Sequence, residues 1–374
     1  TDGAARVLEL FTSTSEQSKA FQCLTARDPS QFWTSGQWMT EKAGGSDVSQ
    51  TATVASRSGQ HYELWGTKWF SSATTSQMAL ALAKDPNRDS ALSLFFVPMH
   101  APTGGLNSLK VLRLKDKLGT KALPTAELQL EGSQAQLVGE SGRGVKTVAT
   151  MLNITRIYNA VCSVAQMRRG LAMASSYAEK REAFGASLKD HPLHLKTLAE
   201  QKLQFFSGQI LTFYLAHLLG KEECQKTTQE ESLILRLLTP VTKLYTGKLA
   251  VQVTSECLEA MGGAGYIENT GFPVLFRDAQ VLPIWEGTTN ILSLDVLRVM
   301  AKTNAFDCFL KKKKKRLERL PQNLQSLTEL AQEHLQKLSK MVQDLSKDPQ
   351  LQEMNARQFA FSLARVQAAV LMLD

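Results

Sequence analysis

The hydrophobic pattern of this chain changes its period once, near residue 143, and that change limits the folds it can adopt. Between residues 35 and 142 the apolar runs are short and separated by turn residues, which is typical of β-strands. From Gly144 onward, apolar residues recur every three or four positions, which predicts amphipathic helices. Strands and helices do not alternate. The sequence therefore predicts an α+β protein without a Rossmann-type sheet.

The β segment, residues 35–142, is expected to form a β-sandwich or a barrel because it holds several short strands at close spacing. Thr51–Arg57 and Tyr62–Lys68 flank a short turn, which is a hairpin pattern. Met78–Ala83 and Ala91–Val97 are two further apolar runs of strand length.

The helical segment predicts an antiparallel bundle over residues 143–304, because long helices with short connections pack in this way. Residues 305–374 continue as a basic helical extension with a break at Asp348-Pro349, and residues 1–34 show weak helical patterning without a clear core. The helices expected within the bundle are Gly144 to about Lys180, His194 to Leu219, Glu230 to Met261, and one that follows Thr288.

Composition excludes several classes of protein. No apolar run approaches the roughly 18 residues of a membrane span, and the N-terminus lacks the pattern of a secretory signal. The 5 cysteines form no CxxC pair, so we expect a reducing, intracellular environment and no disulfide scaffold. The 6 histidines include no HExxH motif, so we expect no metal site. The sequence does not distinguish a mitochondrial from a cytoplasmic location.

Lys311–Lys315 and Arg316 form an uninterrupted basic run in a chain whose net charge is +8. One interpretation is a solvated linker, which we favour because such runs are common on protein surfaces. The other is a contact with the phosphates of DNA or of another polyanion.

The first segment suited to ligand binding is Trp38–Val48, where Gly44 and Gly45 precede Ser46 and Asp47. The glycines allow the backbone to approach a ligand closely, and the N–H groups and hydroxyls could bind a flavin edge or a phosphate. The alternative is an ordinary turn.

The second segment is Gly66–Ser72, in which Trp69-Phe70 is followed by Ser71-Ser72. An aromatic pair can cover a flat ring system while neighbouring hydroxyls bond to its edge. The alternative is a strand with aromatic residues in the core.

Two further segments lie at expected helix ends. In Lys180–Gly185, Arg181 could bind a phosphate with its planar guanidinium or could simply cap the helix. Met261–Tyr266 contains three glycines, which fit either close approach to a ligand or the end of a helix.

The fifth segment is Ile284–Asn290, where Glu286 stands in an apolar setting before Gly287 and two threonines. Burial raises the pKa of a carboxyl group toward neutral pH, which suits a general base. The alternative is a helix N-terminus capped by Thr288, with Glu286 merely close to the helix dipole.

Together, in order and spacing, the five segments resemble the acyl-CoA dehydrogenase family over about residues 36–302. Met39-Thr40-Glu41-Lys42 and the region past residue 305 are similar to one branch, the alkylation-response flavoproteins of the AidB type. The family motifs and their counterparts are the flavin loop TExxxGSD at Trp38–Val48, the second flavin strand at Gly66–Ser72, RxxFG at Arg181–Gly185, GGxGY at Gly262–Tyr266 and EGT at Glu286–Thr288.

The resemblance implies noncovalent FAD between the β domain and the helical domain. It also implies Glu286 as catalytic base, since Thr155, at the alternative base position, has no carboxylate. Ser46 and Arg156 would contact the acyl-CoA. Residues implied to bind the chain's own FAD are Met39, Thr40, Ser46, Phe70, Ser71, Ser72, Gly287, Thr288 and Asn290. Residues implied to reach the FAD of a neighbouring subunit, in a homodimer or homotetramer, are Arg181, Phe184, Gly262, Gly263 and Gly265.

The implied reaction is α,β-dehydrogenation of an acyl-CoA thioester, with electrons passing to an electron-transfer flavoprotein or to oxygen. The alternative is an AidB-like flavoprotein that binds DNA through residues 305–374 and has weak or no dehydrogenase activity. The family's N-terminal helical domain is longer than the residues available here. The predicted division is therefore a remnant of that domain at 1–34, a flavin-binding β domain at 35–142, the bundle at 143–304 and the extension at 305–374.

Overall fold

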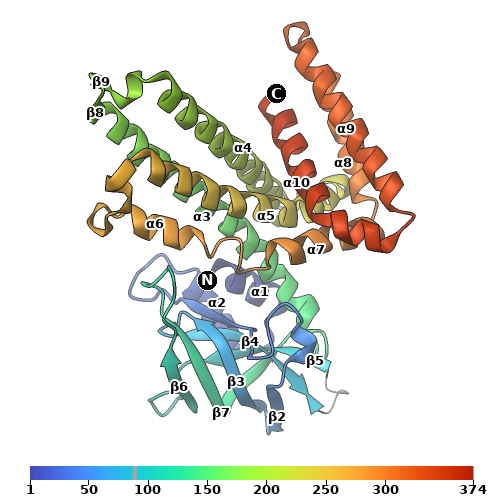
Figure 1. The fold of residues 1–374 in the computed structure, drawn as a ribbon. Helices are drawn as coiled ribbons and strands as arrows, with labels where there is room; N and C mark the ends of the chain where they lie inside the picture. The colour runs from blue at the N-terminus through green and yellow to red at the C-terminus, as the bar shows by residue number, and fades with distance from the viewer. Residues whose placement is uncertain (87–90, 374) are drawn as a thin grey trace. The chain divides into compact units, whose positions relative to one another are not determined.

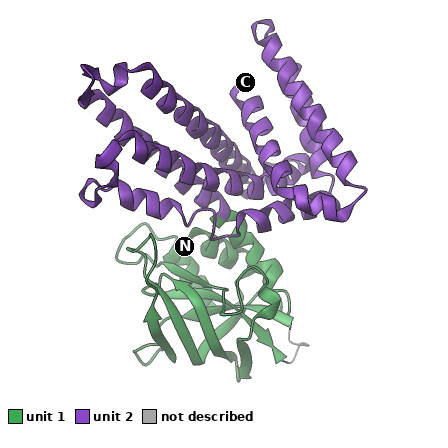
Figure 2. Ribbon diagram, viewed as in Figure 1, with its two compact units in different colours: residues 1–155 green, residues 156–374 purple. Residues whose placement is uncertain are grey.

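The computed structural model describes residues 1–86 and 91–373 (Figure 1). The chain divides into two compact units, residues 1–155 and residues 156–374 (Figure 2). The long helix α3, Gly144–Lys180, begins in the first unit and continues into the second.

The first unit contains a closed β-barrel. Strand β4 pairs with both β2 and β5, and the ring is completed through β3 and β7. Strands β1 and β6 extend the same sheet by pairing with β4 and β7. The expectation of a sandwich or barrel is met by the barrel. The strands are β1 Ser35–Trp38, β2 Val54–Ser58, β3 His61–Ser72, β4 Met78–Asp85, β5 Ala91–Pro98, β6 Leu109–Leu114 and β7 Thr125–Val138.

The expectation that residues 1–34 lack a core is wrong. Helix α1, Asp2–Phe11, packs against the barrel strands through Val7 and Leu8, and helix α2, Ser15–Leu24, packs into the same cluster through Ala20; all three are fully buried. The buried Gln17 amide of α2 donates to the carbonyl of Leu137 in β7 at 2.9 Å. Each helix has only 10 residues, so its stability depends mainly on this packing.

The second unit is helical, as the pattern after Gly144 predicts. The long helices α3, α4 and α5 form its centre, and their apolar faces make one continuous core with α7, α8 and α10. The observed α4 begins two residues before and ends four residues after the predicted limits. The elements after α3 are β8 Glu182–Ala183, β9 Ala186–Ser187, α4 Pro192–Glu223, α5 Gln229–Ala260, η4 Gly262–Tyr266, α6 Phe272–Ala279, α7 Thr289–Lys302, α8 Ala305–Leu317, α9 Gln325–Leu345 and α10 Pro349–Leu373.

The linker interpretation of the basic run is also wrong, because residues 311–316 belong to helix α8. Lys311 and Lys312 form ion pairs with Glu230 and Glu231 of α5, at 3.0 and 3.2 Å. Lys313 is fully buried, with its ammonium 4.9 Å from the centre of the Tyr214 ring. The helix therefore uses part of its positive charge to pack onto the bundle.

No helix within residues 1–86 and 91–373 is both long and apolar enough to cross a membrane. The same residues contain no group of three or more His, Cys, Asp or Glu side chains arranged to hold a metal ion.

Candidate functional site

The first two motif segments lie side by side in the first unit. The backbone N–H of Trp69 in β3 donates to the carbonyl of Thr40 in the loop after β1, at 2.9 Å. Within that loop a Cβ atom added to Gly45 would lie 2.4 Å from the Thr40 hydroxyl oxygen, so only glycine allows the backbone to pass this close. Residues 38–48 and 66–72 therefore form one continuous surface.

A buried ion pair supports this surface from inside. The ammonium of Lys68 donates to the carboxylate of Glu41 and to the carbonyl of Leu82, both at 2.7 Å. The same carboxylate accepts backbone N–H bonds from Ala52 and Thr53, at 2.6 and 3.2 Å. Burial lowers the pKa of Lys68, and the Glu41 charge opposes that decrease. The pair ties the loop to β2, β3 and β4.

The end of β3 presents some of its predicted site residues to solvent and buries others. Phe70 is 54% exposed, and the partly buried Ser72 hydroxyl lies 2.8 Å from that of Thr125. Ser71 is fully buried, and its hydroxyl makes no hydrogen bond within the described part of the chain. A β-bulge between Lys68 and Ser71 produces this arrangement. Phe70 and Ser72 can thus meet a ligand with their side chains, but Ser71 only with its backbone.

The remaining loop residues divide in the same way. Met39 has a buried side chain that packs against the core between the barrel and α1, whereas Ser46 is exposed. Ser46 can therefore contact a ligand directly, and Met39 through its backbone.

In the second unit, Glu286 stands in the turn that leads into α7 and has a left-handed backbone conformation, with φ of +59°. Gly287 follows with φ of +105°. Non-glycine residues seldom adopt positive φ, and such conformations concentrate at functional sites. Thr288 occupies the N-cap position of α7, yet its side chain makes no capping hydrogen bond. Thr288 is therefore at the N-cap, as the alternative interpretation expects, but its side chain does not form the hydrogen bond of a helix cap.

Cationic side chains surround this turn. Arg156 of α3 donates from Nε to the Glu286 carbonyl at 3.3 Å, and Lys243 of α5 donates to the Gly287 carbonyl at 2.6 Å. Asp295 of α7 binds Arg156 at 3.1 Å and Arg236 at 2.7 Å, and holds both in place. The turn is thus connected to two helices, α3 and α5, by hydrogen bonds from cationic side chains.

One side chain in this cluster has a pKa close to neutral pH. Burial lowers the pKa of Lys243 to about 7; the Glu286 carboxylate opposes the decrease and Arg156 adds to it. Burial also lowers the pKa of Arg156, which the charge of Asp295 opposes. Two cations therefore lie close enough to Glu286 to interact with its charge.

The residues expected to serve a neighbouring subunit lie on the surface of the second unit. Phe184, at the tip of the β8–β9 hairpin, is 98% exposed and has φ of +52°. A Cβ atom on Gly262 or Gly263 would meet no atom within 4 Å, so this backbone is open to a ligand. Gly265 differs, because its Cβ atom would lie 2.1 Å from the carbonyl oxygen of Leu258. Arg181 and Asn290 are exposed as well.

Comparison with family models matches nearly the whole chain. The middle domain of acyl-CoA dehydrogenases matches residues 36–133, and their C-terminal domain matches residues 142–301. A third model, described as the acyl-CoA dehydrogenase 11 C-terminal domain-like family, matches residues 304–374. The chain belongs to the acyl-CoA dehydrogenase family. The family expectation and the α+β fold class are confirmed.

Relatives of this acyl-CoA dehydrogenase family member include both an animal and a bacterial protein. Acyl-CoA dehydrogenase family member 11 of Caenorhabditis elegans is 44% identical over 395 residues, which cover 100% of this chain and 64% of that protein. The Escherichia coli (strain K12) protein AidB is 38% identical over 268 residues, covering 71% of this chain and 48% of AidB. The chain thus spans less than two thirds of these relatives.

Solved structures of the family show the same fold. The structure of Caenorhabditis elegans ACDH-11 in complex with C11-CoA superposes with a TM-score of 0.96, at 43% identity, over 100% of this chain and 66% of that chain. An acyl-CoA dehydrogenase from Bacillus anthracis complexed with FAD has a TM-score of 0.82 at 21% identity, covering 98% of this chain and 66% of that one.

Sequence reasoning missed the residues that support the site of this family member. Lys243, Asp295 and Arg236 belong to none of the five motifs, and Lys68 lies in the second motif but was given no role of its own. A lysine or an aspartate within an apolar helix pattern is the signal that could have revealed them, because buried charges need partners. The sequence does not tell which partners these are.

Proposed function

We propose that this chain binds FAD and catalyses α,β-dehydrogenation of an acyl-CoA thioester, with Glu286 as the base. The observation that carries the proposal is the turn at Glu286 and Gly287, which has positive φ and accepts hydrogen bonds from the partly buried Arg156 and the buried Lys243. A base has to be aimed at one proton, and a rigid backbone restricts the directions that its carboxylate can take.

The residues present fit a flavin. The exposed Phe70 ring offers an apolar face, Ser72 and Thr40 offer hydroxyls, and the backbone at Gly262 and Gly263 is open. We assign Met39, Thr40, Ser46, Phe70, Ser71, Ser72, Gly287, Thr288 and Asn290 to the chain's own FAD, as the family motifs imply. FAD supplies the acceptor for the hydride that leaves the β-carbon. The fold of the Bacillus anthracis protein, which holds FAD, supports this assignment.

In the reaction, the thioester carbonyl makes the α-proton of the substrate acidic, and the Glu286 carboxylate takes that proton. Arg156 and Ser46 are assigned to the acyl-CoA, in keeping with the C11-CoA held by the Caenorhabditis elegans relative. Hydrogen-bond donors at the thioester oxygen would stabilise the enolate-like charge. The electrons then pass to an electron-transfer flavoprotein or to oxygen.

We also propose a homodimer or homotetramer, in which Arg181, Phe184, Gly262, Gly263 and Gly265 contact the FAD of a neighbouring subunit. The support is the family motif at Arg181–Gly185, together with the 98% exposure of the Phe184 ring, which leaves it free to contact a neighbour.

The test of this function is an absorbance spectrum of the purified protein, followed by anaerobic titration with acyl-CoAs of several lengths. We expect a flavin spectrum that bleaches when a substrate of suitable length is added. A colourless protein that takes up no FAD from solution would contradict the proposal.

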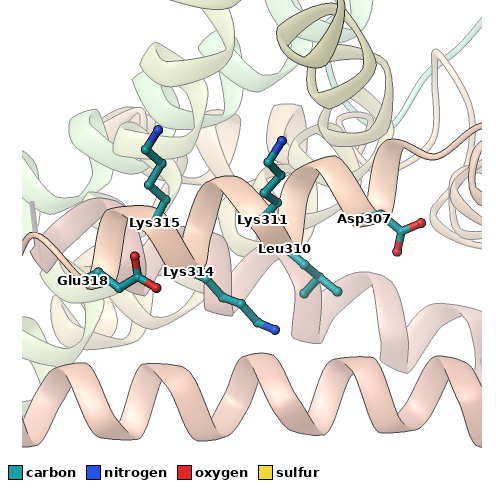
Figure 3. A pocket seen from close by; sticks show the side chains of 6 residues that line it. All are labelled: Asp307, Leu310, Lys311, Lys314, Lys315 and Glu318. Atoms are coloured by element: carbon teal, nitrogen blue, oxygen red, sulfur yellow. The ribbon is translucent and has the colours of Figure 1, made fainter.

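A second candidate function is the binding of DNA through residues 305–374. The observation that favours it is a surface groove beside α8, lined by Lys311, Lys314 and Lys315 together with Asp307, Leu310 and Glu318 (Figure 3). However, Figure 3 shows Lys314 extending to the opposite side of the helix from Lys311 and Lys315. Two acidic side chains also lie among the lysines, so the groove is a weaker match to phosphates than the sequence run suggests.

The test of DNA binding compares the wild type with a Lys314→Gln, Lys315→Gln double variant at low and moderate salt. If the groove binds DNA, the slope of affinity against salt should fall by about two phosphate contacts in the variant. Equal binding with an equal slope would assign any affinity for DNA to another surface.

A further inference from the structure

A buried lysine bonds to the turn of the proposed base, and its separate effect on the reaction can be inferred from its contacts. Lys243 lies in the middle of α5 and is fully buried. Its ammonium donates to the carbonyl of Gly287 at 2.6 Å. Burial of a lysine among apolar side chains is costly unless the lysine has a hydrogen-bond partner. The partner among the described residues is the Gly287 carbonyl, so the role of Lys243 is to be sought at this turn.

The turn needs an external support. Glu286 has φ of +59°, a conformation that side chains disfavour, and Gly287 has φ of +105°. A Cβ atom on Gly287 would lie 2.8 Å from the buried side chain of Leu292, so any larger residue here would force that side chain to shift. Without partners for its carbonyls, Glu286 would relax toward an ordinary backbone conformation, and its carboxylate would turn with it.

The two supports act on consecutive carbonyls. Arg156 holds that of Glu286 from α3, at the longer distance of 3.3 Å, and is itself bound to Asp295. Lys243 holds that of Gly287 from α5, at the shorter distance. We propose that Lys243 is a positioning residue, which fixes the Glu286-Gly287 turn and thereby aims the carboxylate of the base. This inference rests on the proposed function, because aim matters only if Glu286 takes the proton.

The hydrogen bond does not depend on the charge of Lys243. Burial lowers the pKa of this lysine to about 7, but a neutral amine still has N–H groups to donate to a carbonyl. The position of the turn is therefore expected to hold on both sides of neutral pH.

Lys313 offers a matched control in the same unit. It is also fully buried, and its ammonium makes no hydrogen bond within residues 1–86 and 91–373. Its nearest rings, Tyr214 and Phe309, belong to α4 and α8 and not to the turn. Lys313→Met thus removes a buried amine from the same core without touching residues 286 and 287.

The experiment uses the full chain loaded with FAD and an acyl-CoA analogue with sulfur in place of the β-carbon. This analogue can lose its α-proton but has no β-hydrogen to give. Exchange of the α-hydrogen in heavy water, followed by mass spectrometry, reports on the base alone. Titration of the same analogue gives its dissociation constant, and thermal unfolding reports on the fold.

For Lys243→Met we expect α-hydrogen exchange to fall by about 10- to 100-fold, part of the usual effect of a positioned base. The dissociation constant and the FAD content should stay within about threefold, since a positioning role acts on the proton transfer step and not on uniform binding. Lys313→Met should exchange at the wild-type rate. A folded Lys243→Met protein with wild-type exchange would overturn the inference.

The remaining outcomes are also decisive. If the wild type itself exchanges no α-hydrogen, the proposed function fails before the variant is compared. If Lys243→Met does not fold, Lys243→Leu, which also removes the N–H donor, replaces it with the same expected result. If both Lys243 variants lose FAD or unfold, Lys243 is a determinant of the fold, and the positioning role is refuted.

Discussion

The ammonium of Lys68 and the carboxylate of Glu41 form an ion pair at 2.7 Å, in which the lysine side chain has no exposed surface. It lies under the loop at residues 38–48 and the end of β3, which we assign to FAD. A buried pair of this kind leaves an uncompensated charge if one partner is lost.

Glu41→Gln should therefore destabilise the protein by roughly 3–5 kcal/mol, because Lys68 keeps its charge without an anion. FAD retention should fall with stability. Denaturant unfolding and flavin absorbance measure the two effects.

The control for this change is Glu131→Gln. Its partner, Lys110, lies at 2.7 Å, but both side chains are exposed. An exposed pair contributes less than about 1 kcal/mol, so this variant should be close to the wild type. Equal losses in the two variants would show that burial is not what gives the Glu41 pair its effect.

Glu286→Gln keeps the shape of the side chain and removes its basicity. The variant should retain FAD and bind acyl-CoA, while flavin reduction slows by roughly 10² to 10⁴-fold, the usual contribution of a general base. Anaerobic stopped-flow absorbance measures the rate. Reduction at the wild-type rate would mean that another group takes the proton.

Lys313→Met should stabilise the protein at pH 7 by roughly 1–4 kcal/mol, since an apolar side chain replaces a buried amine without an acceptor. Burial, with repulsion from Arg316 and Lys312, lowers the pKa of Lys313 to about 7 from its ordinary 10.5. Between these two values the unfolded chain binds more protons, so wild-type stability rises with pH through that range.

The advantage of Lys313→Met should accordingly be largest at and below pH 7 and shrink toward pH 10.5. Thermal or denaturant unfolding of both proteins across this range measures it. Lys243 contributes a similar slope, which remains in the variant. A constant difference between the two proteins at all pH values would refute the low pKa of Lys313.

Phe184→Ser should weaken both assembly and FAD retention, because the proposal places this ring, which is 98% exposed in one chain, against the FAD of a neighbour. Analytical ultracentrifugation and flavin content measure the two properties. Leu193→Ser, which replaces another highly exposed apolar residue, is the control. A wild-type monomer with full FAD occupancy would contradict the neighbour's role.

Much of the fold is visible in the sequence because its signals are local. The change of period at Gly144, the hairpin around Gly59 and the Asp348-Pro349 break each depend on a few neighbouring residues. In the structure, α3 begins at Gly144, β2 and β3 pair on either side of Gly59, and α10 begins at Pro349. The family motifs are local as well. Their order along the chain was enough to predict membership of the acyl-CoA dehydrogenase family, which the comparisons confirm.

The tertiary structure alone decided which charges are buried and what they hold. Arg156 and Glu286 are 130 positions apart, and Lys243 and Gly287 are 44 apart, so no sequence window contains either contact. The run at 311–316 looks uniform as a sequence, yet packing buries Lys313 and leaves Lys314 beside a groove. A helix turns about 100° per residue, and only the helices packed against it determine which lysine points inward.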